Sequence, residues 1–248
     1  MSNETLCILL GAGLAGFVQG LSGFAFGLVA IPIWASAVPP QMVGPMAVLG
    51  SMLSGLMSIG AARRGFDWSR TWPFIVGGVV GVPIGVRILA YLDPVVFKMA
   101  VGCLLLIYCP VLLLLRHPPS ISTGGRWADA AIGWIGGVMG GIAGLTGPIP
   151  ILWCMLRPWT PLMQRSVFQT FNIAMQALAL TMYAASGMLT PSVLGDFAIV
   201  IPAILLPALV GSRLYHRIDP VAFRRLVLAL LIVSGITLLA VSVPALLR

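Results

Sequence analysis

The chain has 248 residues, of which 59% are hydrophobic and only 8% charged, and its net charge is +8. A soluble domain carries about 25% charged residues to keep its surface hydrated, so this composition indicates a polytopic membrane protein and excludes a separate soluble domain. The basic residues lie mostly in short gaps between apolar runs, which is typical of loops facing an anionic cytoplasmic leaflet and not of a nucleic-acid-binding patch.

Eight apolar segments follow one another along the chain. They are continuously apolar and do not alternate with polar residues, which predicts helices and excludes a barrel. Turn-forming or charged residues such as Asp93-Pro94 and Asp219-Pro220 separate them. We therefore expect an all-α polytopic fold with segments at about 6–38, 40–62, 69–92, 94–115, 128–156, 161–186, 190–215 and 219–247.

The first segment is longer than one membrane span, which needs about 20 residues. Its middle, residues 20–27, is rich in glycine, and a matching run at 140–148 ends with Pro148. Glycine and proline both weaken a helix, so we expect each segment to be broken or re-entrant, with return halves beginning at about Phe24 and Leu145. The alternative is that the glycines serve close helix packing, as small residues do in membranes; this applies to Gly16, Gly20, Gly137 and Gly141.

The two halves of the chain resemble each other. Gly85-Val86-Arg87 recurs 126 residues later as Gly211-Ser212-Arg213, and in both copies Asp-Pro follows six residues after the arginine. The glycine runs and Pro40 recur at an offset of 121 residues. These matches predict an internal duplication, with a first repeat at 1–118, a polar linker at 119–127 and a second repeat at 128–248.

The distribution of basic residues predicts how the repeats are oriented. If all eight segments crossed the membrane, six basic residues would face one side and eight the other. If the first segment of each half is a re-entrant hairpin, one side receives eleven and the other only Arg87, Lys98 and Arg248. The positive-inside rule favours the second arrangement, in which each repeat crosses three times and the two are inverted.

No acidic residue lies near the middle of a segment. The six acids, which all lie at segment ends, are Glu4, Asp67, Asp93, Asp129, Asp196 and Asp219. A cation transporter normally keeps a carboxylate within the membrane, so this distribution argues against a cation substrate. The four cysteines lack CxxC spacing and are interpreted as packing residues, so we expect no metal and no cofactor.

An anion requires hydrogen-bond donors and helix N-termini, and candidate donors are present. Arg165, Gln169, Asn172 and Gln176 are spaced by four, three and four residues and form one stripe of a helix, although Arg165 can also be read as a loop charge. The equivalent helix of the first repeat carries Ser51, Ser54 and Ser58. The candidate substrate-binding residues are Gln19, Ser22, Gly23, Phe24, Gly144, Thr146, Gln169, Asn172 and Gln176. The alternative is that such side chains form hydrogen bonds between helices.

The sequence does not favour an enzyme. Gly20-Leu21-Ser22-Gly23 matches the GxSG of rhomboid intramembrane proteases, but that chemistry needs a histidine at the serine. The two histidines, His117 and His216, lie beside charged segment ends. The sequence has no phosphate-binding loop, so we do not expect ATP to be the direct energy source.

The glycine-rich runs resemble those of the sulfite exporter TauE/SafE family. Residues 11–34, GAGLAGFVQGLSGFAFGLVAIPIW, are similar to its opening signature, and residues 136–152, GGVMGGIAGLTGPIPIL, resemble the repeat of it. The Gly-x-Arg at 85–87 and 211–213 is also similar. The resemblance covers the whole chain and implies export or import of sulfite, sulfonates, thiosulfate or related small organic anions.

We therefore expect a secondary transporter of a small anion that works by alternating access in the cell inner membrane, with no nucleic-acid partner. Membrane lipid surrounds it, and the chain could act alone or as a homodimer. The alternative is a non-transport membrane scaffold or assembly subunit.

Overall fold

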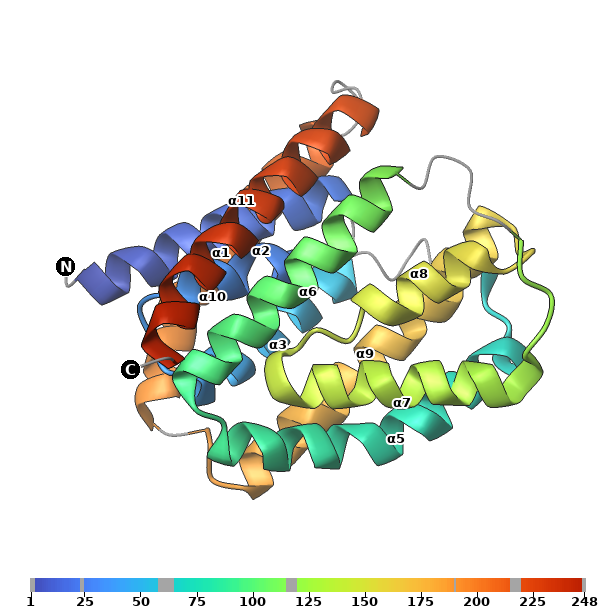
Figure 1. Ribbon diagram of the computed structural model, residues 1–248, viewed down its shortest axis with the longest axis horizontal. Helices are drawn as coiled ribbons and strands as arrows, with labels where there is room; N and C mark the ends of the chain where they lie inside the picture. Colours follow the sequence, from blue (N-terminus) through green and yellow to red (C-terminus); the bar gives the residue numbers. More distant parts are fainter. Residues whose placement is uncertain are drawn as a thin grey trace.

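The computed structural model describes residues 3–22, 25–57, 65–114, 120–189, 191–214 and 220–246. This part of the chain is all-helical and contains no strand (Figure 1), as the sequence predicts. The helices are α1 (Asn3–Ser22), α2 (Phe26–Trp34), α3 (Pro40–Met57), α5 (Trp68–Tyr91), α6 (Pro94–Leu114), α7 (Gly125–Ala143), α8 (Pro148–Leu156), α9 (Pro161–Ala185), α10 (Pro191–Leu214) and α11 (Pro220–Leu246).

The residues that separate the apolar segments also start the helices. Proline is the first residue of α3, α6, α8, α9, α10 and α11, where its fixed φ suits the helix and its missing amide hydrogen costs nothing. The Asp93 carboxylate caps α6 by accepting from the Val95 amide at 2.7 Å. Asp67 caps α5 through the Ser69 amide at 2.9 Å, and the hydrogen bond from the Ser69 hydroxyl lowers the pKa of Asp67.

The first and fifth apolar segments are both broken into a long helix and a nine-residue helix. Helix α2 packs back along α1, because the Trp34 Nε1 donates to the Ile8 carbonyl at 3.0 Å while the Phe26 amide donates to Gln19 at 2.9 Å. Helix α8 packs back along α7 in the same way (Figure 1). The return helices begin at Phe26 and Pro148, slightly later than the predicted Phe24 and Leu145.

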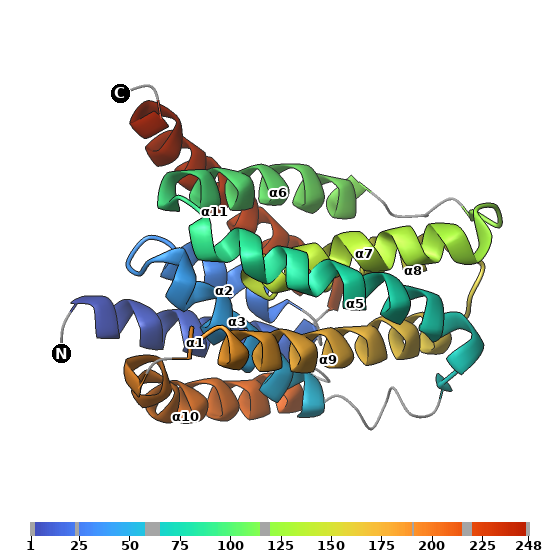
Figure 2. The same ribbon diagram turned by 90° about the horizontal axis from the view of Figure 1, so that it is seen from below.

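Glycine packing joins helices from different halves of the chain. Helix α7 runs alongside α5 in the same direction, because Gly77 meets Ala130 and Gly85 meets Val138. Helix α1 runs alongside α10 in the same way (Figure 2). Gly16 contacts the backbone at Ile204, and Gly20, one turn later, contacts the backbone at Ala208. Without a hydrophobic driving force in lipid, such close backbone contacts are what hold helices together.

The packing alternative is therefore correct for four of the glycines. A Cβ atom would collide with the backbone of the neighbouring helix at Gly16, Gly20, Gly137 and Gly141. These residues precede the breaks and hold the long helices in place. The second break is formed by the residues that follow α7, at 144–147; the first lies between the end of α1 at Ser22 and the start of α2 at Phe26.

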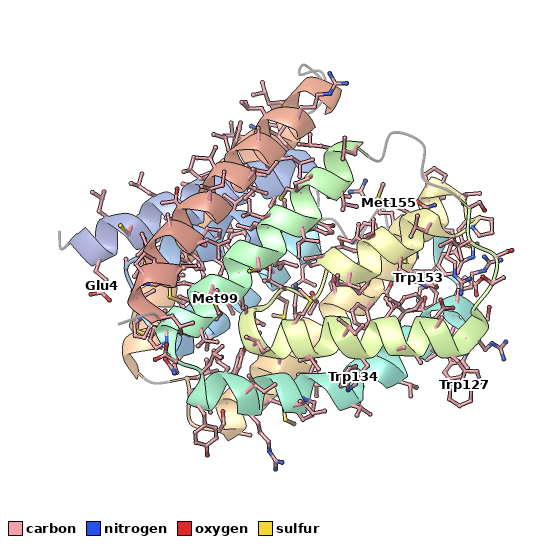
Figure 3. The ribbon with its side chains drawn as sticks, viewed as in Figure 1. Glu4, Met99, Trp127, Trp134, Trp153 and Met155 are labelled. Carbon is pink, nitrogen blue, oxygen red and sulfur yellow. The ribbon has the colours of Figure 1, made fainter. Side chains whose placement is uncertain are left out.

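The outer surface of the bundle is apolar. Within the described residues, four stretches are long and apolar enough to cross a membrane: Glu4–Leu21, Trp68–Tyr91, Pro94–Leu114 and Arg225–Leu246. Trp127 at the start of α7 is 89% exposed and points away from the helices (Figure 3), as aromatic side chains do at a membrane–water interface.

A buried ion pair fixes the start of α7. Arg157 contacts Asp129 at 2.8 Å and donates to the carbonyl of Thr123 at 2.8 Å, while the Trp153 Nε1 donates to the same carboxylate at 2.7 Å. Arg157 is only 7% exposed, although it lies in a gap between two apolar segments, where the basic residues are expected to face water. Helix α7 starts at Gly125, three residues before the predicted segment at 128.

Candidate functional site

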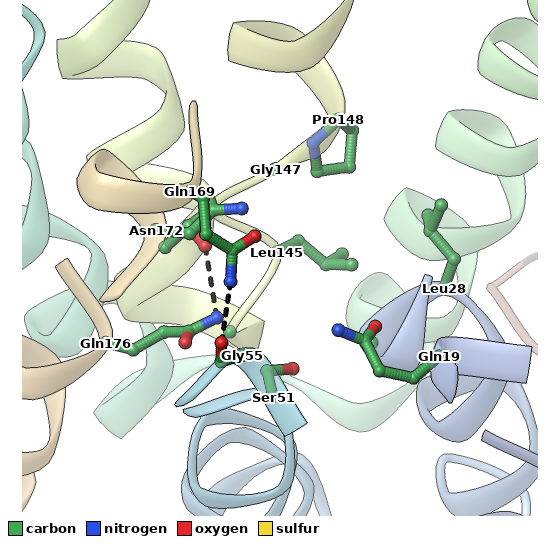
Figure 4. Close-up of a pocket in the computed structure, with 13 residues that line it drawn as sticks. Gln19, Leu28, Ser51, Gly55, Leu145, Gly147, Pro148, Gln169, Asn172 and Gln176 are labelled. Atoms are coloured by element: carbon green, nitrogen blue, oxygen red, sulfur yellow. Dashed lines mark hydrogen bonds between the residues drawn. The ribbon is translucent and has the colours of Figure 1, made fainter. Parts of the chain in front are cut away.

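A small cavity lies between the helix ends that flank the first break and the residues of the second break (Figure 4). It has a free volume of about 30 Å³, which is room for about two water molecules. Helices α1, α2, α3 and α9 and the break between α7 and α8 all contribute to its wall. The lining residues are Gln19, Gly27, Leu28, Ser51, Gly55, Gly144, Leu145, Thr146, Gly147, Pro148, Gln169, Asn172 and Gln176.

Gly27, in the first turn of α2, lies against Leu145 of the second break. A Cβ atom on Gly27 would lie 3.2 Å from the Leu145 Cδ2 and 3.7 Å from the Gly144 carbonyl oxygen. Gly144 ends α7 in the left-handed conformation, with φ of 69°, which L side chains rarely adopt. Its Cβ atom would also lie 2.9 Å from the Val48 amide of α3. Glycine at this position therefore lets the second break approach α3 closely.

Gln19 links the first break to the cavity. It lies on the last turn of α1 and is 5% exposed. Its Oε1 accepts a hydrogen bond from the Phe26 amide at 2.9 Å, and the first amides of a helix have no partner inside the helix. Gln19 therefore caps α2 from outside and presents its Nε2 to the cavity.

The polar stripe of α9 faces the same cavity from the other side. Gln169, Asn172 and Gln176 are all buried. The Gln169 Nε2 donates to the Gly55 carbonyl at 2.9 Å, and the Gln176 Nε2 donates to the Thr146 hydroxyl at 3.4 Å. Arg165, one turn earlier, is exposed and is not among the lining residues.

Six of the nine candidate residues thus line one cavity: Gln19, Gly144, Thr146, Gln169, Asn172 and Gln176. Gly23, Phe24 and the side chain of Ser22 lie outside the described residues. Both interpretations of the stripe, helix contacts and substrate binding, have a basis. Gln169 and Gln176 each donate a hydrogen bond to a neighbouring element through Nε2 and leave Oε1 unbonded. That these residues bind substrate stays a prediction.

The sequence analysis named Ser51 as a donor on the equivalent helix but did not place Ser51 or Gly55 in the candidate site, although a usable signal was present. At the 121-residue offset of the duplication, Ser51 is the counterpart of Asn172 and Gly55 of Gln176. Equivalent positions of α3 and α9 therefore both line the cavity. The list of predicted binding residues included only those of α9.

None of the residues that line the cavity carries a charge. Any ion bound there must be held by amide and hydroxyl groups and by helix dipoles. The helix ends offer fewer amides than the breaks suggested, because Pro148 and Pro150 have no amide hydrogen and the Phe26 amide is already bonded to Gln19. No cluster of metal-binding side chains occurs in the part of the chain that the structure describes.

The comparisons with known proteins agree on one family. Residues 8–238 match the family model described as Sulfite exporter TauE/SafE. A curated protein of Cupriavidus necator, the probable sulfite/organosulfonate exporter TauE, is 24% identical over 244 residues, which cover 96% of this chain and 93% of that protein. No solved structure is significantly similar.

Proposed function

Because the chain belongs to the sulfite exporter TauE/SafE family of membrane transporters, we propose that it moves sulfite or an organosulfonate across the membrane through the cavity between the two breaks. The observation that carries this proposal is the composition of the cavity: buried amide and hydroxyl groups, no carboxylate, and two helix N-termini. The relative from Cupriavidus necator, named for sulfite and organosulfonate, suggests the substrate class.

An uncharged site suits an anion that must leave as well as bind. Each helix N-terminus is equivalent to about half a positive charge, and α2 and α8 both begin at the cavity. The Nε2 of Gln19 adds a donor whose direction is fixed by the Phe26 amide. This combination attracts an anion without the strong binding that a buried arginine would give.

We further propose that the two repeats, 1–118 and 128–248, are inverted and that each begins with a re-entrant hairpin. The helix directions support this arrangement. Helix α2 returns along α1, α3 turns back again, and α5 follows in the direction opposite to α3. Helix α7 runs parallel to α5 and therefore opposite to α1. With eleven basic residues then on one face, that face is the cytoplasmic one of the inner membrane.

Alternating access follows from this symmetry as a proposal. The cavity lies between two hairpins that enter from opposite faces, so an exchange of their conformations would open it first to one side and then to the other. In the present conformation its free volume is about 30 Å³, so the proposed cycle also needs a conformation in which the cavity is wider.

The test is transport by the purified chain alone in liposomes loaded with sulfite. Wild-type protein should release sulfite, and Gln169→Leu should reduce the rate at least tenfold because it removes both polar atoms from the cavity wall. Gln164→Leu is the matched control, since Gln164 lies on α9 but bonds to the carbonyls of Arg157 and Trp159 outside the cavity. Absence of flux with the wild-type chain would favour the scaffold alternative.

A further inference from the structure

Backbone groups fix the direction of two amides in the cavity. The Oε1 of Gln19 accepts from the Phe26 amide, which can only donate, so the Nε2 is the atom presented to the cavity. The Nε2 of Gln169 donates to the Gly55 carbonyl, which can only accept, so the Oε1 is presented. Figure 4 shows the two side chains on opposite sides of the cavity. Of the two amides whose direction is fixed, Gln19 therefore offers a donor and Gln169, on the other side, an acceptor.

The acceptor side holds further unbonded oxygens. Asn172 Oδ1 and Gln176 Oε1 are buried and have no hydrogen-bond partner among the described residues. Both lie on α9, on the same stripe as Gln169. Buried acceptors without a partner are destabilising, and an oxyanion that carries only acceptor oxygens cannot satisfy them. A ligand with its own hydrogen-bond donor can.

We propose that the substrate is a monoanion that carries a hydrogen-bond donor: a protonated oxyanion such as hydrogen sulfite, or a sulfonate with a hydroxyl or amino group. Its anionic oxygens face Gln19 and the helix ends, and its donor faces Gln169. This inference rests on the proposed function and specifies its substrate class. A doubly charged, fully deprotonated oxyanion is excluded because the wall has no positive side chain and the Gln169 Oε1 faces the ligand.

The decisive comparison uses two sulfonates of equal charge and nearly equal size. In 2-hydroxyethanesulfonate a hydroxyl group takes the place of the terminal methyl group of 1-propanesulfonate. Binding to purified wild-type protein is measured by calorimetry in sodium-free choline buffer. We expect the hydroxylated compound to bind at least tenfold more tightly, because a site built to bond a hydroxyl group rejects an analogue without one.

Two matched variants test which side of the cavity distinguishes the two sulfonates. Gln169→Met removes the acceptor at similar size, so the affinity ratio should fall to about twofold. Gln19→Met removes the donor and should weaken both sulfonates while keeping their ratio. Thermal unfolding of each variant verifies its fold, and the wild-type ratio tests the proposal even where a variant fails to fold.

A pH series tests the protonated-oxyanion form of the proposal. Sulfite loses its last proton near neutral pH, so its affinity should fall about tenfold per pH unit above that point. The affinity of 2-hydroxyethanesulfonate, which keeps its charge and its donor, should not change. The pH dependence should come from the ligand, because the lining has no titratable side chain. The charged residues on the surrounding helices lie elsewhere: Asp129 of α7 is paired with Arg157, Arg165 of α9 is exposed, and Glu4 lies at the far end of α1.

Three results would overturn the inference. Equal affinity of the two sulfonates would show that no donor is read while leaving the proposed function intact. Binding that requires sodium would show that the unbonded oxygens hold a cation. If neither sulfonate nor sulfite binds, the proposed function is wrong and this inference fails with it.

Discussion

Gln19→Glu should separate folding from anion binding at a single side chain. The substitution keeps an oxygen that can accept from the Phe26 amide, a bond of 2.9 Å in the structure, so the cap of α2 survives. It replaces the Nε2 donor with a carboxylate oxygen. Two like charges about 4 Å apart repel by about 4 kcal/mol at an effective dielectric constant of 20, which corresponds to an affinity loss of about 10²- to 10³-fold.

The assay is calorimetric binding of 2-hydroxyethanesulfonate from alkaline to mildly acidic pH, with thermal unfolding measured in parallel. Binding to the variant should be lost at alkaline pH and should recover as the pH falls, because protonation removes the charge and restores a donor. Gln164→Glu, outside the cavity, should bind like the wild type throughout. Wild-type affinity of Gln19→Glu at alkaline pH would refute the assignment of Gln19 to the anion site.

Three further predictions follow from the packing. Gly81→Ala should lower the melting temperature, because its Cβ atom would lie 2.8 Å from the Val138 amide of α7. The control Gly195→Ala, with open space around it, should leave the melting temperature unchanged, and equal effects of the two variants would contradict the packing of α5 on α7. Arg157→Met should destabilise the fold by about 3–5 kcal/mol in denaturant unfolding, because it leaves a buried carboxylate unpaired; an unchanged midpoint would show that the pair contributes nothing. Single cysteines at Phe66 and Ser186, both exposed, should label from opposite faces in a cysteine-free chain, and labelling from one face would rule out inverted repeats.

The sequence predicted the elements well because their boundaries depend on local chemistry. Prolines and capping aspartates start helices wherever they stand, so the ends of the apolar segments agree with the helix ends to within a few residues at most positions. The breaks were also predictable, since glycine and proline cannot sustain a helix there. Their exact position was not, because the cap of α2 is Gln19, seven residues before the amide that it binds.

The candidate site was predictable to the extent that it follows helical spacing. Gln169, Asn172 and Gln176 share one face of α9 by their spacing alone, and that face lines the cavity. Gly55 was not predictable because its role is a backbone carbonyl, 114 residues away from Gln169 in sequence. The buried pair of Asp129 and Arg157 was missed for a related reason. Charged residues near segment ends usually face water, and only the packing of α8 against α7 brings these two together.

The pairing of α1 with α10 and of α5 with α7 means that the predicted repeat is not the unit that moves. Glycine contacts between backbones leave no room for one helix of a pair to slide past the other. Each pair therefore moves as one rigid body that combines a helix from each half of the chain. Any motion that opens the cavity must therefore occur between the α1–α10 pair and the α5–α7 pair. Its hinges must lie inside each half of the chain, in the segments that connect one pair to the other.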